Sequence, residues 1–187
     1  MNKFFVLITF LFLVSCNDHN EAPQANRFDG IDKGISGIII GDPETTLKLI
    51  DKSWIDSLAP LESLILSNKS KNQFVEIIHH PGDIRYSISE FKLTQSIPYE
   101  RKYSQLDEVE VFKTHLGITL GMTMDNVQNI LGKGKLFPDD DGNSMLEYQV
   151  DSKDSDFLKK VNMPKYYGKY YFHHNILIEI HWGLEQV

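Results

Sequence analysis

Hydrophobic and polar positions follow the same rhythm in two stretches of the chain that lie 80 residues apart. In each stretch two glycines, separated by three mostly apolar residues, precede a run with apolar residues at helical spacing. The apolar positions are Leu47, Ile50 and Trp54 in the first run, and Val127, Ile130 and Leu131 in the second. This spacing is typical of a helix that packs one face on a core. We therefore predict two short amphipathic helices, each entered through a sharp glycine turn.

Residues at the ends of both runs favour helix caps. Asp42 is a good N-cap, and Pro43 fits the first helical position, where its missing N–H group costs nothing. Thr123 takes the cap position of the second run, and the helix dipole favours Asp125 in its first turn. Gly132 is placed to end this helix, because glycine adopts left-handed conformations easily. The two runs therefore match in their chemistry as well as in their letters.

Strand-like segments with polar turns between them follow each predicted helix. The predicted strands after the first helix cover residues 61–67, 74–78 and 84–94, and those after the second lie within residues 135–150 and 168–184. Residues 151–165 are an insertion in the second copy. We predict an α+β fold, a tandem repeat of helix plus antiparallel sheet units, with the first over residues 34–107 and the second over residues 108–187. Units this small are expected to share a core or to pack side by side.

The N-terminus has the features of a bacterial lipoprotein signal. Lys3 precedes an apolar run that ends at Val14, which is about half the length needed to span a bilayer. The run leads into Leu-Val-Ser-Cys, which resembles a lipobox, and Cys16 is the only cysteine of the chain. We expect a signal peptide over residues 1–15, lipidation of Cys16 and a polar tether over residues 16–33. An ordinary secretory signal with a chance cysteine is the alternative.

The predicted signal peptide and lipidated cysteine would place the folded part on a membrane, outside the cytoplasm. Two or more acyl chains hold a protein on a bilayer stably, whereas one chain binds only marginally. The protein is then anchored by lipid to the cell membrane or the outer membrane, and it faces the periplasm or the cell surface. Without Lys3, 18 basic residues stand against 26 acidic ones, a formal charge of −8. That balance argues against nucleic acid as a partner, since nucleic acids favour clusters of Lys and Arg.

The second half resembles a known family of envelope proteins. The stretch GITLGMTMDNVQNILGKG, followed by the YYFHHNILIEI hairpin, is similar to the SmpA/OmlA (BamE-like) lipoproteins and to the related repeats of beta-lactamase-inhibitory protein. Residues 110–187 carry nearly all of this resemblance, and the first half matches only in its helix motif and strand order. The resemblance implies an α+β fold with helices on one face of each sheet. It implies function less well, because such folds serve assembly, inhibition and other roles.

A run of aromatic residues near the C-terminus is the main candidate for a binding surface. Successive residues of a strand point to opposite faces, so this run places large rings on both. One face should pack on the helices, and the other has no obvious core to enter. Tyrosine is enriched at protein interfaces. The candidate protein-binding residues are Tyr166, Tyr167, Tyr170, Tyr171 and Trp182. The alternative is that these rings pack between the two repeats.

Histidines occur in pairs at corresponding points of the two copies. The pairs are His79 with His80 and His173 with His174, and each falls where we predict a turn. We expect polar hairpin tips. The alternative is a zinc site that takes one histidine from each copy, because imidazole is a common zinc ligand.

Motifs for catalysis are absent from the sequence. It has no free thiol in the mature chain, no Gly-x-Ser-x-Gly elbow and no phosphate-binding glycine loop. We expect a non-enzymatic lipoprotein without cofactors that acts through protein contacts, as a scaffold or an inhibitor. A small-ligand or metal-binding module that uses the His-bearing hairpins is the second hypothesis. A third, an envelope hydrolase, requires a cleft.

Overall fold

A computed structural model describes residues 31–56, 63–80, 85–139 and 141–185. In chain order its elements are β1 (Gly34–Ile35), β2 (Ile38–Ile39), α1 (Pro43–Leu49), α2 (Lys52–Asp56), β3 (Ser63–Ser67), β4 (Phe74–Ile78), β5 (Glu90–Thr94), β6 (Ser104–Gln105), α3 (Met124–Leu131), β7 (Lys135–Pro138), β8 (Asn143–Asp151), a 3-10 turn (Ser152–Asp154), α4 (Asp156–Lys160), β9 (Lys165–His173) and β10 (Ile176–Glu185). The fold is mixed α+β and mostly sheet, which confirms the predicted class at this level.

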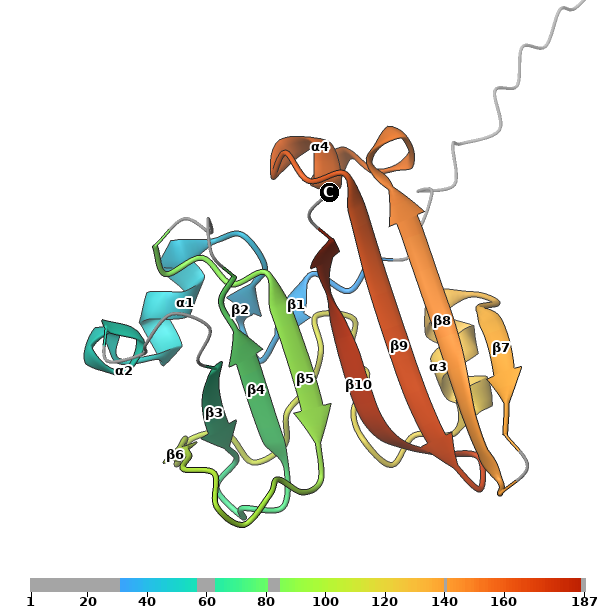
Figure 1. Cartoon of the computed structure of the whole chain (residues 1–187), viewed down its shortest axis with the longest axis horizontal. Helices are drawn as coiled ribbons and strands as arrows, with labels where there is room; N and C mark the ends of the chain where they lie inside the picture. The colour runs from blue at the N-terminus through green and yellow to red at the C-terminus, as the bar shows by residue number, and fades with distance from the viewer. Residues whose placement is uncertain (1–30, 57–62, 81–84, 140, 186–187) are drawn as a thin grey trace, which may run out of the picture.

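One eight-stranded sheet contains most of the strands from both halves of the chain (Figure 1). Its strand order is β6-β3-β4-β5-β10-β9-β8-β7, and all neighbours are antiparallel except β3 and β6. The two halves meet where β5 pairs with β10, from Glu90 opposite Gly183 to Thr94 opposite Glu179. The halves are therefore joined through backbone hydrogen bonds, as neighbours within one sheet.

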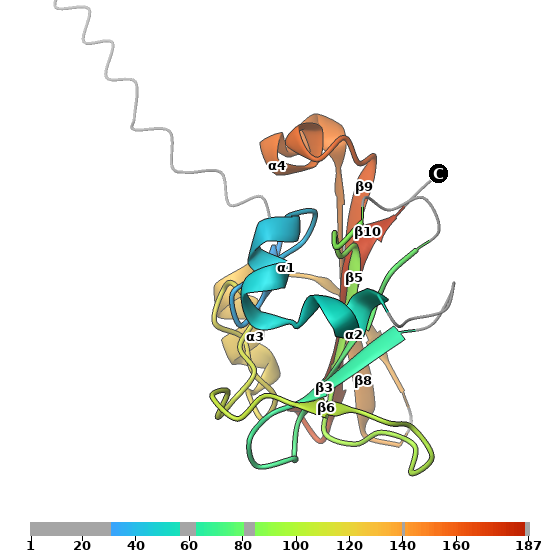
Figure 2. The ribbon, with the colours of Figure 1, turned by 90° about the vertical axis from the view of Figure 1, so that its left-hand side faces the viewer.

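The helices α1 and α3 lie on the same side of this sheet (Figure 2). Their predicted N-caps are confirmed: the Asp42 carboxylate accepts hydrogen bonds from the backbone N–H groups of residues 44 and 45, and the Thr123 hydroxyl accepts one from Asn126. Gly132 ends α3 at a φ of 81° and donates to Gln128. Local capping chemistry thus sets where both helices begin and where α3 ends.

The second glycine of each bracket makes the same kind of turn. Gly41 and Gly121 have φ values of 76° and 90°, which a side chain would strain. The N–H group of Gly41 donates to the carbonyl of Ile88 at 2.9 Å, and that of Gly121 donates to Leu177 at 2.8 Å. Ile88 lies just before β5 and Leu177 lies at the start of β10. Each glycine therefore joins the start of its helix to one of the two central strands, β5 for α1 and β10 for α3.

The core lies between the helices and the sheet and takes residues from both halves. Its largest fully buried side chains include Trp182, Tyr166, Tyr170, Phe91 and Phe112. In α3, Val127 and Leu131 are buried as predicted. In α1, Leu47 is 40% exposed and Thr46 is buried in its place, which corrects the predicted apolar stripe. The reason is that α1 ends at Leu49, so that Ile50 enters the core from an extended C-cap and Trp54 belongs to the separate α2.

The predicted strands are confirmed with changed boundaries. The strand over Phe74–Ile78 is found as predicted, whereas the expected strand over residues 84–94 is shorter and begins at Glu90. Tyr86 has a φ of 64°, which interrupts extended structure before β5. Residues 151–165, which we expected to be an insertion, include the 3-10 turn and α4. None of the helices in the described ranges is long and apolar enough to cross a membrane.

Candidate functional site

Strand β9 divides its aromatic residues between the two faces of the sheet. Tyr166 and Tyr170 are fully buried, as is Trp182 on the neighbouring β10. Tyr167 and Tyr171 are half-buried and lie on the opposite face. The five predicted contact residues therefore separate into three core residues and two that solvent reaches. Only Tyr167 and Tyr171 remain candidates for partner contact, because strand alternation turns the other three toward the helices.

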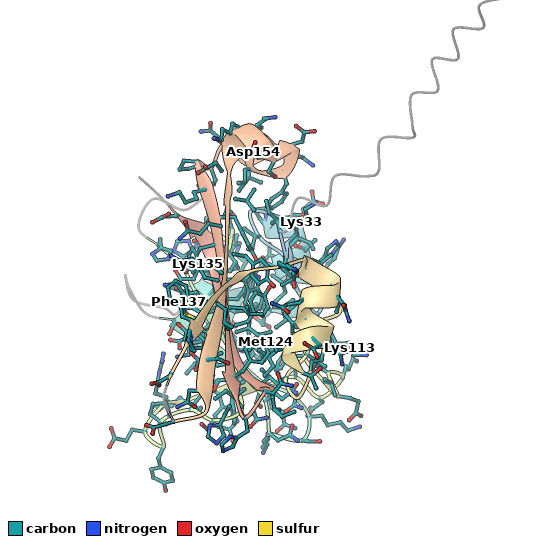
Figure 3. All side chains as sticks on the ribbon, turned by 90° about the vertical axis from the view of Figure 1, so that its right-hand side faces the viewer. Lys33, Lys113, Met124, Lys135, Phe137 and Asp154 are labelled. Carbon is teal, nitrogen blue, oxygen red and sulfur yellow. The ribbon has the colours of Figure 1, made fainter. Side chains whose placement is uncertain are left out.

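The sheet face opposite α1 and α3, which we call the open face, is polar and aromatic. Strand registers place its side chains in rows across the sheet. One row runs Glu76, Lys92, His181, Lys169, Glu147 and Lys135, and the next runs Phe74, Thr94, Glu179, Tyr171, Met145 and Phe137. Figure 3 shows Lys135 and Phe137 on the side away from α3. The first row carries charges of both signs, and the second combines apolar and aromatic side chains with Thr94 and Glu179, so the face offers both kinds of contact.

A hydrogen-bonded cluster lies where the two halves meet on the open face. Glu90 of β5 has its carboxylate 2.7 Å from Nε2 of His80 and 2.5 Å from Nε2 of His181. The hydroxyl of Tyr167 lies 3.2 Å from the same Nε2 of His181, and the two rings are perpendicular. Gly183 lies opposite both Glu90 and Tyr167 in the registers, and a Cβ there would come within 2.6 Å of the Ser89 carbonyl. A side chain at Gly183 would therefore push β5 and β10 apart.

The pKa shifts indicate that Glu90 is ionised in this cluster. Burial by itself would raise the pKa of Glu90, but the hydrogen bonds and charges of His181 and His80 together lower it. An ionised carboxylate only accepts hydrogen bonds, so each imidazole donates from Nε2. Burial and the nearby Glu90 charge raise the pKa of Tyr167, which keeps its hydroxyl protonated. Glu90 thus ties a histidine from each half to one partly buried negative charge.

A shallow hollow of about 500 Å³ opens at the other end of the same face. Phe137, Met145, Tyr171 and Ile178 supply apolar surface, and polar residues such as Asn143, Ser144 and Glu179 also line the hollow. Phe137 and Ile178 are 36% and 37% exposed, although both are large hydrophobic residues. Exposed apolar surface that is rimmed by polar groups commonly marks a contact site for another molecule.

Ion pairs hold other polar side chains of the open face. Lys92 lies 3.1 Å from Glu179, and Lys165 lies 3.3 Å from Glu185. At the β3 side, Arg101 reaches Glu76 at 2.6 Å from the loop that follows β5. Several charges of the open face are therefore paired, and surface pairs of this kind add little stability.

The paired histidines do not come together in space. Strands β4 and β9 run in opposite directions, so His79 and His80 after β4 and His173 and His174 after β9 lie at opposite ends of the sheet. His173 and His174 form the tip of the β9–β10 hairpin, where His173 bonds Asn143 at 2.8 Å. A zinc site that joins His79 or His80 to His173 or His174 is therefore not formed in this arrangement. No group of three or more candidate metal ligands occurs in the part of the chain that the structure describes.

One site was not predicted from the sequence, and one predicted site lies outside the described residues. The Glu90 cluster was missed, because Glu90 and His181 are 91 residues apart and only the pairing of β5 with β10 brings them together. Cys16, the predicted lipidation site, lies outside the described residues.

Comparisons with protein-family models, with curated proteins and with solved structures found no match to this chain.

Proposed function

We propose that this protein is a non-catalytic lipoprotein of the cell envelope that binds a partner protein through the open face of its sheet. The observation that carries the proposal is the exposed aromatic and apolar surface formed by Tyr167, Tyr171, Phe137 and Ile178. It lies on a broad sheet face, and α1 and α3 lie on the other side of the sheet (Figure 2). Aromatic residues are enriched in the buried part of protein interfaces, and polar groups are usual at the rim.

The lipid anchor rests on the N-terminal sequence. Lys3, the apolar run and Cys16 support export and lipidation, and residues 16–33 then serve as a tether. Acyl chains on Cys16 would keep the folded part at a membrane surface, where the open face could meet a partner in the same envelope. Cys16→Ala should move the protein from the membrane fraction to the soluble fraction. An unchanged distribution would contradict lipid anchoring.

We further propose that the two halves are copies of one unit, as in the resemblance to SmpA/OmlA lipoproteins and inhibitor repeats. The strand order supports this, because β3-β4-β5 and β8-β9-β10 occupy mirrored places on either side of the β5–β10 pair. The matching hydrogen bonds of Gly41 and Gly121 support it as well. Duplication would explain why a chain of this size spreads one wide sheet, a suitable platform for a protein partner.

The binding proposal can be tested by replacing the exposed tyrosines together. Tyr167→Ser with Tyr171→Ser should abolish capture of a discrete envelope protein by the tagged, membrane-anchored chain. Tyr99→Ser is the matched control, because Tyr99 is fully exposed on the loop between β5 and β6 and is not one of the residues that form this surface. Thermal melting of each variant shows that the fold is intact. Equal capture by a folded double variant and by wild type would overturn the proposal.

A further inference from the structure

Asp32 is a buried acid at the start of the described fold. Its side chain is fully buried, and its Oδ1 accepts a hydrogen bond from the backbone N–H of Leu116 at 3.2 Å. Its own N–H donates to the Tyr166 hydroxyl at 3.2 Å. Its second oxygen, Oδ2, has no hydrogen-bond partner in the described part of the chain. Asp32 thus connects the beginning of the first half to two segments of the second half.

The residues that follow Asp32 are fastened to the same segment of the second half. The carbonyl of Gly34 accepts from His115 at 2.8 Å, and the N–H of Ser36 donates to Lys113 at 2.8 Å. Ile31 and Ile35 are buried in the core beside them. Residues 31–36 and 113–116 therefore form one docking contact, which we call the N-terminal latch. Apolar burial and backbone hydrogen bonds hold it at every pH.

The carboxyl group of Asp32 adds a dependence on pH. Burial raises the pKa of Asp32 from 3.8 to about 7, against hydrogen bonds from residues 114–116 that lower it. On β9, the titratable groups near the Asp32 carboxyl group are the hydroxyls of Tyr166 and Tyr170. Burial raises the pKa of both hydroxyls and keeps them neutral. The neighbouring Lys33 lies over the Phe157 ring at 5.4 Å, and His115 is exposed. The described neighbours thus offer hydrogen bonds to the carboxylate and leave Oδ2 unpaired.

We propose that Asp32 makes the N-terminal latch protonation-dependent. The latch is most firmly closed when the carboxyl group is neutral, and it opens more often when the group is charged. Opening exposes the acid to water, where its pKa returns to the ordinary value. Because the pKa of Asp32 is higher in the closed state than in the open state, protonation of Asp32 stabilises the closed latch. This stabilisation is complete below the ordinary pKa of the group and is lost as the pH rises through its pKa in the closed state. The opening constant should therefore rise about tenfold per pH unit between pH 5 and 7, and level off above about pH 8.

The consequence depends on the proposed lipid anchor, although the latch itself does not. Residues 31–33 form the end of the expected tether over residues 16–33, and residues 34–36 follow it directly. Six residues in an extended chain span about 20 Å. If Cys16 holds the protein on a membrane, each opening of the latch would let the sheet reach about 20 Å further from that surface. Lipidation of Cys16 and opening of the latch are measured separately, so failure of one leaves the other standing.

Amide hydrogen exchange of the whole protein between pH 5 and 9 tests the latch. The reporters are the N–H groups of Ser36, His115 and Leu116, with rates corrected for intrinsic exchange. They should exchange faster than the amides of β4 and β5, and their opening constants should follow the predicted rise and plateau. Asp32→Asn should remove the rise, whereas Asp156→Asn, whose side chain is 99% exposed, should keep it.

Two results would overturn the proposal. One is an opening constant of the wild-type reporters that does not change between pH 5 and 7. The other is exchange of the reporters at the same rate as the amides of β4 and β5, because these residues would then open only when the whole fold does. Both results are read from the wild-type protein, so they remain decisive even if Asp32→Asn fails to fold.

Discussion

Tyrosines stand on both faces of β9, and their surroundings differ completely. Tyr166 and Tyr170 are enclosed by the core, where burial raises the pKa of both hydroxyls. Tyr167 and Tyr171, their neighbours along the strand, lie on the open face and remain partly exposed. The same residue type therefore serves packing on one face and stays available for contact on the other. The two roles differ because successive residues of a strand point to opposite faces. The residue type is the same in both.

Removal of a core ring should have the largest effect on stability. Trp182 is fully buried and its ring contacts Phe91 with centroids 5.3 Å apart. Trp182→Ala should lower the free energy of unfolding by about 3–5 kcal/mol, because it removes a large buried side chain and leaves a cavity. Denaturant unfolding measures the loss. Tyr171→Ser on the open face should cost less than about 1 kcal/mol, since that side chain is already partly in water. Equal losses would remove the distinction between the faces.

Loss of the Glu90 charge should have an intermediate, pH-dependent effect. The pKa of Glu90 is lower in the folded protein than its ordinary value of 4.5. The ionised form of Glu90 therefore stabilises the fold above pH 4.5, and this stabilisation is lost as the pH falls through the pKa of the folded state. Glu90→Gln should therefore be less stable than wild type at pH 7, with the difference closing below pH 4.5. Thermal melting across this range measures it.

A matched variant separates this effect from the loss of any acid. Glu100 lies exposed on the loop before β6. Glu100→Gln should melt like wild type throughout the same pH range. If Glu90→Gln also melted like wild type, the cluster on the open face would not contribute to joining the halves.

Local chemistry explains how much of the fold the sequence predicts. The cap residues Asp42 and Thr123 and the turn glycines act on their immediate neighbours, so the helix starts could be predicted closely. The alternation of aromatic residues likewise predicted one packed and one open face. The exposed position of Leu47 could not be predicted, because it depends on where α1 stops against the rest of the core.

Contacts between distant segments account for what the sequence did not predict. The Glu90 cluster requires the register of β5 on β10, and the burial of Asp32 requires residues 113–116 and β9 to pack around it. The separation of the histidine pairs follows from the opposite directions of β4 and β9. Sheet order and register depend on contacts between segments that are distant in the chain, so no short motif predicts them.

The most direct test of the open face as a contact surface is site-specific photo-crosslinking in intact cells. A photoreactive phenylalanine replaces Tyr171 on the open face or, as the control, Asp125, which is exposed on α3 at the other side of the sheet. We predict a crosslink from position 171 to one discrete envelope protein, and none to that protein from position 125. Crosslinks to the same protein from position 125 alone, or no crosslink from position 171 in a folded variant, would contradict the proposed function.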